Sequence, residues 1–196
     1  MTSILKVDTI QDTDGNNIIN ESGNTITIGA SGDTTNIIGT LQNDGSAVGG
    51  TNTPAFSATM SGAQSFSNST STKVQFDTEQ FDTASAYDHS SNYRFTVPSG
   101  QAGKYFIYAK IFYNDQASTD ANRKIHIYKN GSNAGTGQTR TVGTTGRDGT
   151  VAASQVYDLS VGDYIEIYGQ LDISGGSSRI MDGGKCRFTG YRMIGA

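Results

Sequence analysis

Apolar and polar residues alternate with a period of two through most of the chain beyond residue 55. The period is clearest in five segments, residues 56–60, 73–76, 93–97, 124–128 and 164–171. Successive side chains of a β-strand point to opposite faces, so one apolar face is typical of a half-buried strand. No segment shows the three-to-four-residue apolar period of an amphipathic helix. The pattern predicts an all-β fold.

Residues 105–112 depart from this alternation, because both faces of the predicted strand are apolar. The segment reads Tyr-Phe-Ile-Tyr-Ala-Lys-Ile-Phe, with Lys110 as its only charged residue. A strand that is covered on both sides has this pattern. In a sandwich, one face of this strand would meet the core, and a neighbouring subunit could cover the other.

Turn-forming residues separate the predicted strands. Asn130-Gly131 is a strong hairpin signal, because a type I′ turn requires positive φ at both central residues. Pro98-Ser99-Gly100 and Val161-Gly162-Asp163 mark two further turns. The number and spacing of the strands favour a sandwich or jelly roll. The Gly/Thr-rich stretch 135–149 is expected to be a long loop.

The aromatic residues divide the chain into two regions. All 18 Phe and Tyr residues lie at or beyond Phe56, and aromatic side chains dominate the energetics of protein cores. Residues 1–55 contain one Lys and six acidic residues, whereas residues 56–196 carry a net charge of +1. We therefore expect an N-terminal anchoring segment and stalk over residues 1–53, and a globular head over residues 54–196.

Short aliphatic clusters recur in the N-terminal region, at residues 18–19, 26–28 and 37–38. Glycines punctuate them every seven to nine residues, so each unit resembles a brief strand and a turn. One copy would expose these isoleucines, whereas three copies wound around a common axis would bury them. An extended β-rich stalk is our interpretation. A flexible linker rich in Gly and Asn is the alternative.

Composition and charge exclude several classes of protein. The net charge of −4 argues against a nucleic-acid partner, which requires a basic face. No run approaches 18 apolar residues, so we expect no membrane insertion. The first residues lack a basic segment followed by an apolar one, so we expect synthesis in the cytoplasm without a secretion signal. Cys186, the only cysteine, is expected to be a buried thiol.

The order of motifs in the head resembles the C1q/TNF-like family. The motifs that carry the resemblance are residues 55–58 (AFSA), 73–76 (KVQF), 87–88 (YD), 92–98 (NYRFTVP), 103–108 (GKYFIY), 129–131 (KNG), 159–165 (LSVGDYI) and 188–191 (FTGY). The resemblance covers about residues 55–194, and the stretch 135–149 departs from the family pattern. It implies a jelly-roll sandwich head, assembly as a homotrimer, and a binding rather than a catalytic role.

The opening of the chain is similar to the start of tail-fibre and other virion proteins of marine cyanophages, through SILKVDTIQD and GNNIINESGNTITIG. With the C1q-like head, this implies a bacteriophage fibre or spike on the tail or capsid surface. The N-terminal segment would contact other virion proteins, and the head would bind a host-surface glycan or protein in adsorption. A purely structural capsid or tail decoration or head-fibre protein is the alternative, and a polysaccharide depolymerase is a third hypothesis.

The sequence offers little support for an enzyme. His89 and His126 are the only histidines, neither has metal-ligand spacing, and no G-x-S-x-G element occurs. His126 is expected at the solvent or at an interface. Asp77, Glu79 and Asp82 are the carboxylates from which a glycan-cleaving pair could be drawn, and a solvated strand edge is the other interpretation. We therefore expect no catalytic residues.

Three residues are candidates for ligand binding. Tyr87 and Tyr113 lie in segments that resemble loops, where their rings could stack on sugars, and packing in the core is the alternative. Arg147 lies in a Gly-rich loop, where plain exposure to solvent is the alternative.

One predicted loop also offers oxygen ligands for a calcium ion. Asn114, Asp115 and Asp120 share this loop, and calcium binds carboxylate and amide oxygens. The spacing is not that of an EF-hand, so unliganded surface acids are the other interpretation. No cofactor is expected, with calcium left open.

Overall fold

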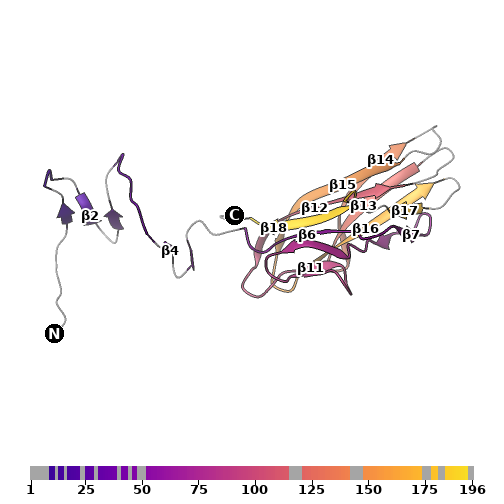
Figure 1. The fold of residues 1–196 in the computed structure, drawn as a ribbon, viewed down its shortest axis with the longest axis horizontal. Helices are drawn as coiled ribbons and strands as arrows, with labels where there is room; N and C mark the ends of the chain where they lie inside the picture. Colours follow the sequence, from indigo (N-terminus) through magenta and orange to yellow (C-terminus); the bar gives the residue numbers. More distant parts are fainter. Residues whose placement is uncertain are drawn as a thin grey trace. The chain divides into compact units, whose positions relative to one another are not determined.

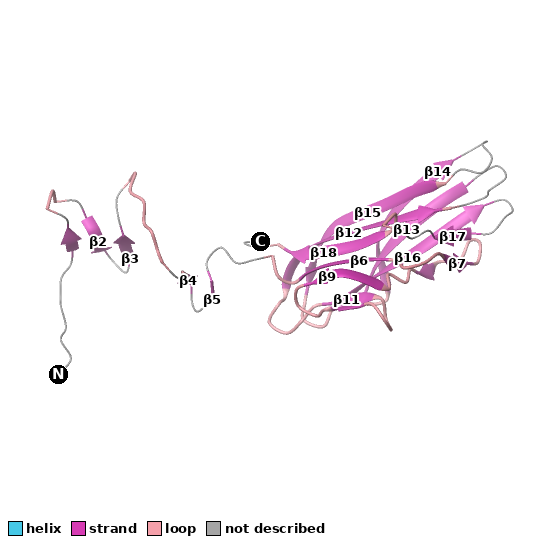
Figure 2. Cartoon of the chain, viewed as in Figure 1, coloured by secondary structure: helices cyan, strands magenta, loops and turns pink. Residues whose placement is uncertain are grey.

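The computed structural model describes residues 9–11, 13–15, 17–22, 25–28, 31–38, 41–43, 46–47, 52–114, 121–141, 148–173, 178–180 and 184–193. The chain divides into two compact units, Met1–Gly49 and Gly50–Ala196. The described residues form strands and no helix, which confirms the all-β prediction (Figure 2). Accordingly, these residues include no helix that could cross a membrane.

The N-terminal unit contains short antiparallel strands. Strands β1 (Thr9–Gln11), β2 (Asn17–Ser22) and β3 (Thr25–Ile28) form one sheet, and β4 (Gln42–Asn43) pairs with β5 (Ser46–Ala47). Several aliphatic side chains of this unit are between 38% and 96% exposed, namely Ile10, Ile19, Ile26, Ile28, Ile37, Ile38 and Leu41. A single chain therefore leaves these side chains without apolar cover.

The first sheet of the head consists of β8 (Thr72–Lys73), β10 (Tyr87–Asp88), β11 (Arg94–Thr96), β13 (Ala121–Lys129), β14 (Ser132–Thr141) and β16 (Tyr164–Ile173). The strand order is β10-β11-β16-β13-β14, and β8 also pairs with β16. Every one of these pairings is antiparallel. These strands form the β16 sheet.

The second sheet consists of β6 (Ala55–Thr59), β7 (Gln64–Phe66), β9 (Thr78–Asp82), β12 (Gly103–Tyr113), β15 (Gly149–Leu159), β17 (Ser178–Ile180) and β18 (Arg187–Arg192). Strand β12 pairs with β15 along its whole length on one side, and with β18 and β17 on the other. The order then continues from β18 to β6 and β9. Figure 1 shows β15, β12, β18 and β6 side by side in this β12 sheet.

The core lies between the two sheets. Strand β12 contributes Tyr105, Ile107, Ala109 and Ile111, all fully buried. The β16 sheet contributes residues such as Ile125, Ile127, Ile165 and Ile167. The residues of the β16 sheet are at positions where the two-residue period of the sequence predicts buried side chains.

Phe56 of β6 is the centre of an aromatic cluster in this core. Its ring stacks on Phe95 at 4.8 Å and on Tyr87 at 5.2 Å, and it meets Phe188 edge to face at 4.8 Å. Offset stacked and edge-to-face pairs are favourable beyond the area that they bury. The cluster joins β6 and β18 of one sheet to β10 and β11 of the other.

Gly190 of β18 makes room for this cluster. A Cβ atom at Gly190 would lie 2.7 Å from Cδ1 of Ile107 and 2.9 Å from Cε1 of Phe56. Neither distance is compatible with an unshifted core. The glycine of the FTGY motif therefore allows β18 to lie beneath the aromatic ring.

The predicted loop over residues 135–149 is wrong in its first part, because β14 extends to Thr141. A Cβ atom at Gly137 would lie 2.3 Å from the carbonyl oxygen of Ala152, and one at Gly135 would lie 2.8 Å from Oη of Tyr157. These glycines allow β14 to approach β15 closely, which is a known use of glycine within strands. Residues 142–147 lie outside the described residues.

The Asn130-Gly131 turn has the predicted conformation, with φ values of 52° and 77°. Positive φ at both positions is what a type I′ turn requires.

Cys186 is fully buried, as expected. Its Sγ accepts a hydrogen bond from the backbone N–H of Phe112, at a distance of 3.3 Å.

We predict that Gly190→Ala lowers the free energy of unfolding by about 1–3 kcal/mol, because the added methyl group overpacks the core. Urea unfolding followed by circular dichroism measures this change. Gly62→Ala is the matched control, because a Cβ atom there meets nothing within 4 Å; its effect should stay within about 0.5 kcal/mol. Equal stability of the two variants would contradict the prediction.

Candidate assembly interface

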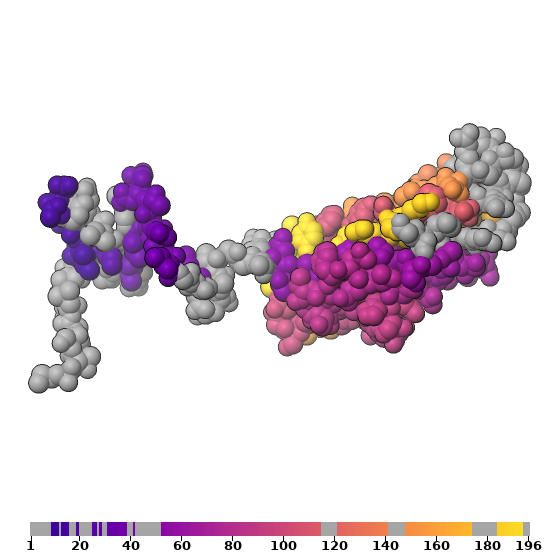
Figure 3. Space-filling model, in the orientation of Figure 1, coloured from indigo at the N-terminus to yellow at the C-terminus, as the bar shows by residue number. Residues whose placement is uncertain are grey.

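The outward face of the β12 sheet carries apolar side chains that the single chain does not cover fully. The pleat of β12 places Phe106, Tyr108, Lys110 and Phe112 on this face, opposite the buried set, and all four are half-buried. Figure 3 shows β18 in yellow on the surface of the head, bordered by the earlier strands in purple and magenta. The sequence predicted this second apolar face from residues 105–112.

Neighbouring strands extend the apolar face around β12. Phe106 lies between Tyr191 of β18 and Val156 of β15 in the strand register, and the rings of Phe106 and Tyr191 are 5.5 Å apart. Val156 is 45% exposed and Tyr191 is 38% exposed. Neither residue lies in the segment 105–112, from which the second apolar face was predicted.

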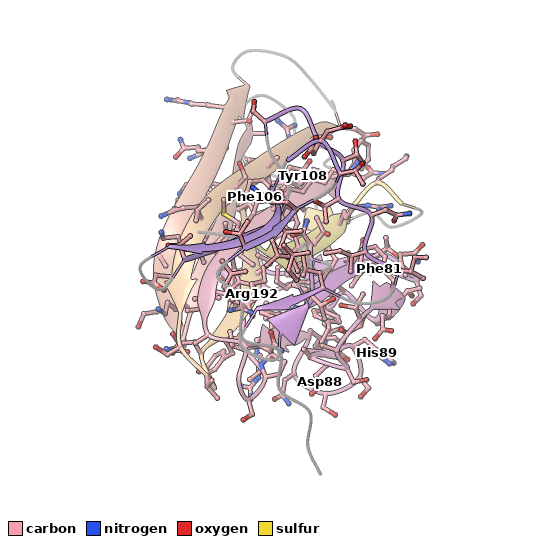
Figure 4. The ribbon with its side chains drawn as sticks, turned by 90° about the vertical axis from the view of Figure 1, so that its left-hand side faces the viewer. Phe81, Asp88, His89, Phe106, Tyr108 and Arg192 are labelled. Atoms are coloured by element: carbon pink, nitrogen blue, oxygen red, sulfur yellow. The ribbon has the colours of Figure 1, made fainter. Side chains whose placement is uncertain are left out.

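Phe81 of β9 belongs to the same face. In the strand register Phe81 lies opposite Ser57 of β6, and Ser57 lies opposite Thr189 of β18. Thr189 in turn lies opposite Tyr108 of β12. Residues that lie opposite each other share one face of a sheet. Phe81 is 49% exposed, and Figure 4 labels it together with Phe106 and Tyr108. We call Phe81, Phe106, Tyr108, Val156 and Tyr191 the aromatic patch.

The outward face of the β16 sheet has a different character, because most of its charged side chains have partners within the chain; Arg140, which is exposed opposite Asn122, makes no ion pair among the described residues. Lys73 pairs with Glu166, and Lys124 Nζ lies 3.0 Å from Oδ2 of Asp172. The Arg94 guanidinium lies 4.2 Å from the centroid of the Tyr164 ring. These contacts satisfy the charges within the chain. Of the two faces, the β12 sheet therefore offers the better surface for assembly.

Asp163 holds two turns of the head together. Its carboxylate accepts hydrogen bonds from Asn130 Nδ2 at 2.8 Å and from the Ser160 backbone N–H at 2.9 Å. Lys129 Nζ lies 3.0 Å from Oδ2 of the same carboxylate. Hydrogen bonds from Asn130 and Ser160, with the ammonium group of Lys129, lower the pKa of Asp163 from 3.8 to about 2.

Tyr87 and Tyr113 are not available for ligand stacking, which corrects the prediction for both. Tyr87 is 5% exposed and Tyr113 is fully buried. The hydroxyl of Tyr87 donates to the carbonyl oxygen of Phe76 at 3.0 Å, and that of Tyr113 donates to the carbonyl oxygen of Lys124 at 2.7 Å. Burial raises the pKa of both hydroxyls. Both rings pack in the core because they lie at buried positions of strands rather than in loops.

The other predicted ligand residues lie outside the residues that the structure describes, or at the end of a described range. Arg147, Asp115 and Asp120 lie outside the described residues, and Asn114, which is half-buried, ends the described range 52–114. The predictions for these residues therefore stay predictions. Across the described ranges, no group of three or more His, Cys, Asp or Glu side chains lies close enough to hold a metal ion.

His126 does not lie at the solvent, one of the two positions expected for it. It is 8% exposed, because Asn133 and Thr136 of β14 cover it; its Nδ1 lies 2.9 Å from Oγ1 of Thr136 and 3.2 Å from Nδ2 of Asn133. Burial is the main reason why the pKa of the His126 imidazole lies below its ordinary value. His89 is exposed and follows Asp88 in the β10–β11 turn, as Figure 4 shows.

The carboxylates considered for glycan cleavage have different surroundings. Asp77 accepts a hydrogen bond from the backbone N–H of Ser61 at 2.7 Å, and Asp82 accepts one from the backbone N–H of Tyr87 at 2.7 Å. Glu79 is exposed on β9. Asp77 and Asp82 thus bind backbone groups of the loops beside them.

Comparison with solved structures identifies the class of fold. The chain is similar to Eiger TNF from S. frugiperda, with 14% identity and a TM-score of 0.53 over 72% of this chain and 93% of that one. The globular domain of zebrafish complement 1qA protein (14% identity, 72% and 98% covered) and murine APRIL at pH 8.5 (11% identity, 71% and 98% covered) both give a TM-score of 0.49. At such identities a likeness concerns the fold alone.

The head is therefore an antiparallel jelly roll of the C1q/TNF-like fold class, as the motifs of the sequence predicted. No protein-family profile matches the chain, and no curated protein matches it.

We predict that Asp163→Asn lowers the thermal unfolding midpoint at pH 7. The pKa of Asp163 is lower in the folded protein than in the unfolded chain, so its stabilising effect is complete above about pH 4 and is lost as the pH falls toward 2. The difference in unfolding midpoint between wild type and variant should therefore become smaller as the pH falls from about 4 toward 2. Asp158→Asn, at an exposed position of β15, is the control. A difference that stays constant down to pH 2 would refute the prediction.

Proposed function

We propose that this chain is the subunit of a homotrimeric bacteriophage fibre or spike whose head binds a ligand on the host surface. The observation that carries the proposal is the aromatic patch, an apolar sheet face that one chain leaves partly exposed. The N-terminal segment would attach the fibre to other virion proteins. The role is binding rather than catalysis.

Further copies of this chain are the cover that fits the aromatic patch. Burial of apolar surface drives most protein association, and aromatic residues are enriched in the cores of interfaces. The patch lies on the β12 sheet, whose order and pairing support the resemblance to the C1q/TNF-like family. That resemblance implies three copies around one axis.

The N-terminal unit supports the same stoichiometry by an independent argument. Ile26 is 68% exposed and Ile38 is 96% exposed, although aliphatic residues of this size are usually buried. Three copies around a common axis would give these residues a shared apolar core without aromatic side chains. This is the ordered stalk proposed for residues 1–53.

The resemblance of the opening segment to cyanophage tail-fibre proteins supports a place on the virion, on the tail or the capsid surface. A rigid β scaffold that carries variable loops is a common plan for binding. Three heads on one stalk would also multiply a weak site by avidity, provided that all three can reach the surface together.

We predict that the wild-type chain has a mass of about 62 kDa by light scattering, as three copies of a 20.7 kDa chain require. Phe106→Glu should shift the mass toward the single chain, because the interface would lose the apolar area of the ring and would have to draw a carboxylate out of water. Gln138→Glu is the control, since Gln138 is exposed on the outward face of the β16 sheet and lies opposite Lys124. A wild-type monomer, or a trimer that tolerates Phe106→Glu, would refute the interface.

We predict that excess purified protein slows adsorption of the virions to host cells. The Phe106→Glu chain should compete less well at equal concentration, by up to about 10²-fold, because a monomer lacks avidity. Gold labelling of intact virions would show where the protein lies. Virion labelling without competition would favour the purely structural alternative. Release of reducing ends from host glycans would instead favour a depolymerase.

A further inference from the structure

Three cationic side chains lie together on the outward face of the β12 sheet, next to the aromatic patch. Lys110 of β12 and Arg187 of β18 are directly opposite in the strand register. Lys185 precedes β18, and its Nζ lies 4.5 Å from the centroid of the Phe112 ring. We call Lys110, Lys185 and Arg187 the cationic cluster. Like charges that lie directly opposite each other destabilise a sheet, so this arrangement calls for a compensating group.

The described residues do not provide that compensation. None of the three cations makes an ion pair with an acidic residue within the described part of the chain. On its other side Lys110 lies opposite Ala152 of β15. Arg187 makes a long contact, with its Nη1 3.4 Å from Oγ of Ser57. The cluster thus contrasts with the β16 sheet, where Lys73, Lys124 and Lys129 all have carboxylate partners.

The position of the cluster makes its charge costly in an assembly. Lys110 is the next outward residue after Tyr108 on β12, so cover of the aromatic patch would also draw the cluster away from water. A buried charge without a partner is strongly destabilising. This argument rests on the proposed trimer, whereas the juxtaposition of the three cations is present in a single chain.

We propose that the cationic cluster binds a multivalent oxyanion of the sulfate or phosphate class at the interface between copies of this chain. The planar guanidinium of Arg187 matches two oxygens of such an ion. The ammonium groups of Lys110 and Lys185 supply further donors and charge. The anion replaces the carboxylate that these residues lack in the described chain, and it removes the repulsion between Lys110 and Arg187.

Equilibrium dialysis of the full-length protein against radiolabelled sulfate tests the proposal. Chloride keeps the ionic strength constant, so that general screening is the same in every sample. The wild-type protein should take up sulfate to saturation in the millimolar range or below. The double variant Lys110→Met/Arg187→Met should bind at least about tenfold more weakly, because it loses two charge-assisted contacts.

Lys104→Met is the matched control. Lys104 lies on the same face of β12, but it is directly opposite the acidic residue Asp158. This variant should bind sulfate as the wild type does.

Thermal unfolding gives a second test of the site. In chloride alone the double variant should unfold at a higher temperature than the wild type, because the repulsion between Lys110 and Arg187 is gone. Added sulfate should raise the midpoint of the wild type and leave that of the double variant nearly unchanged.

Light scattering on the same samples separates failure of this site from failure of the trimer. Sulfate uptake by a monomer, lost in the double variant, would overturn the trimer and support the site. A wild-type trimer that shows no saturable uptake of sulfate would overturn the site. If the double variant then also has a lower mass by light scattering than the wild type, carboxylates of a second copy are the partners of the cluster. Undiminished uptake by the double variant also overturns the site. Should the double variant fail to fold, Lys185→Met, at an exposed position, applies the same test.

Discussion

Strand β12 carries apolar side chains on both faces, and the head is organised around it. One face meets the β16 sheet through residues such as Ile107 and Ile111, which are fully buried. The other face belongs to the aromatic patch, to which β9, β15 and β18 contribute through their pairing. A fold that completes its own core can still leave such a face partly exposed, and the proposed assembly would cover it. The stability of the head and the proposed assembly thus depend on the same strand, one through each face.

Much of the fold was predictable because its signals are local. The two-residue period marks buried positions such as Ile125 and Ile127, and Asn130-Gly131 marks a hairpin whose backbone conformation only certain residues adopt easily. The stretch after Gly135 was misassigned because the reason for its glycines is not local. They are needed where β14 approaches β15, and a close distance between two strands leaves no pattern within either strand.

The candidate interface was predictable in part, for the same reason. Residues 105–112 showed that a second apolar face exists, since the pattern lies within one strand. Phe81, Val156 and Tyr191 join that face only through the register of β9, β15 and β18, which no single segment reveals. Tyr87 was misplaced because its neighbours in sequence are small or polar, whereas its neighbours in space are the rings of Phe56 and Phe188.

Strand β6, the first strand of the head, has a hydrogen-bonded neighbour on each side, β9 and β18. Hydrogen bonds between antiparallel strands are perpendicular to the strand direction. Tension directed along β6 would therefore load both rows of bonds at once, in shear, instead of peeling them apart one pair at a time as at a free edge. The backbone N–H of Arg192 also donates to the carbonyl oxygen of Pro54 at 2.9 Å, just before β6 begins. A pull along β6 would thus meet more resistance than the same pull on a strand that can be peeled from a free edge.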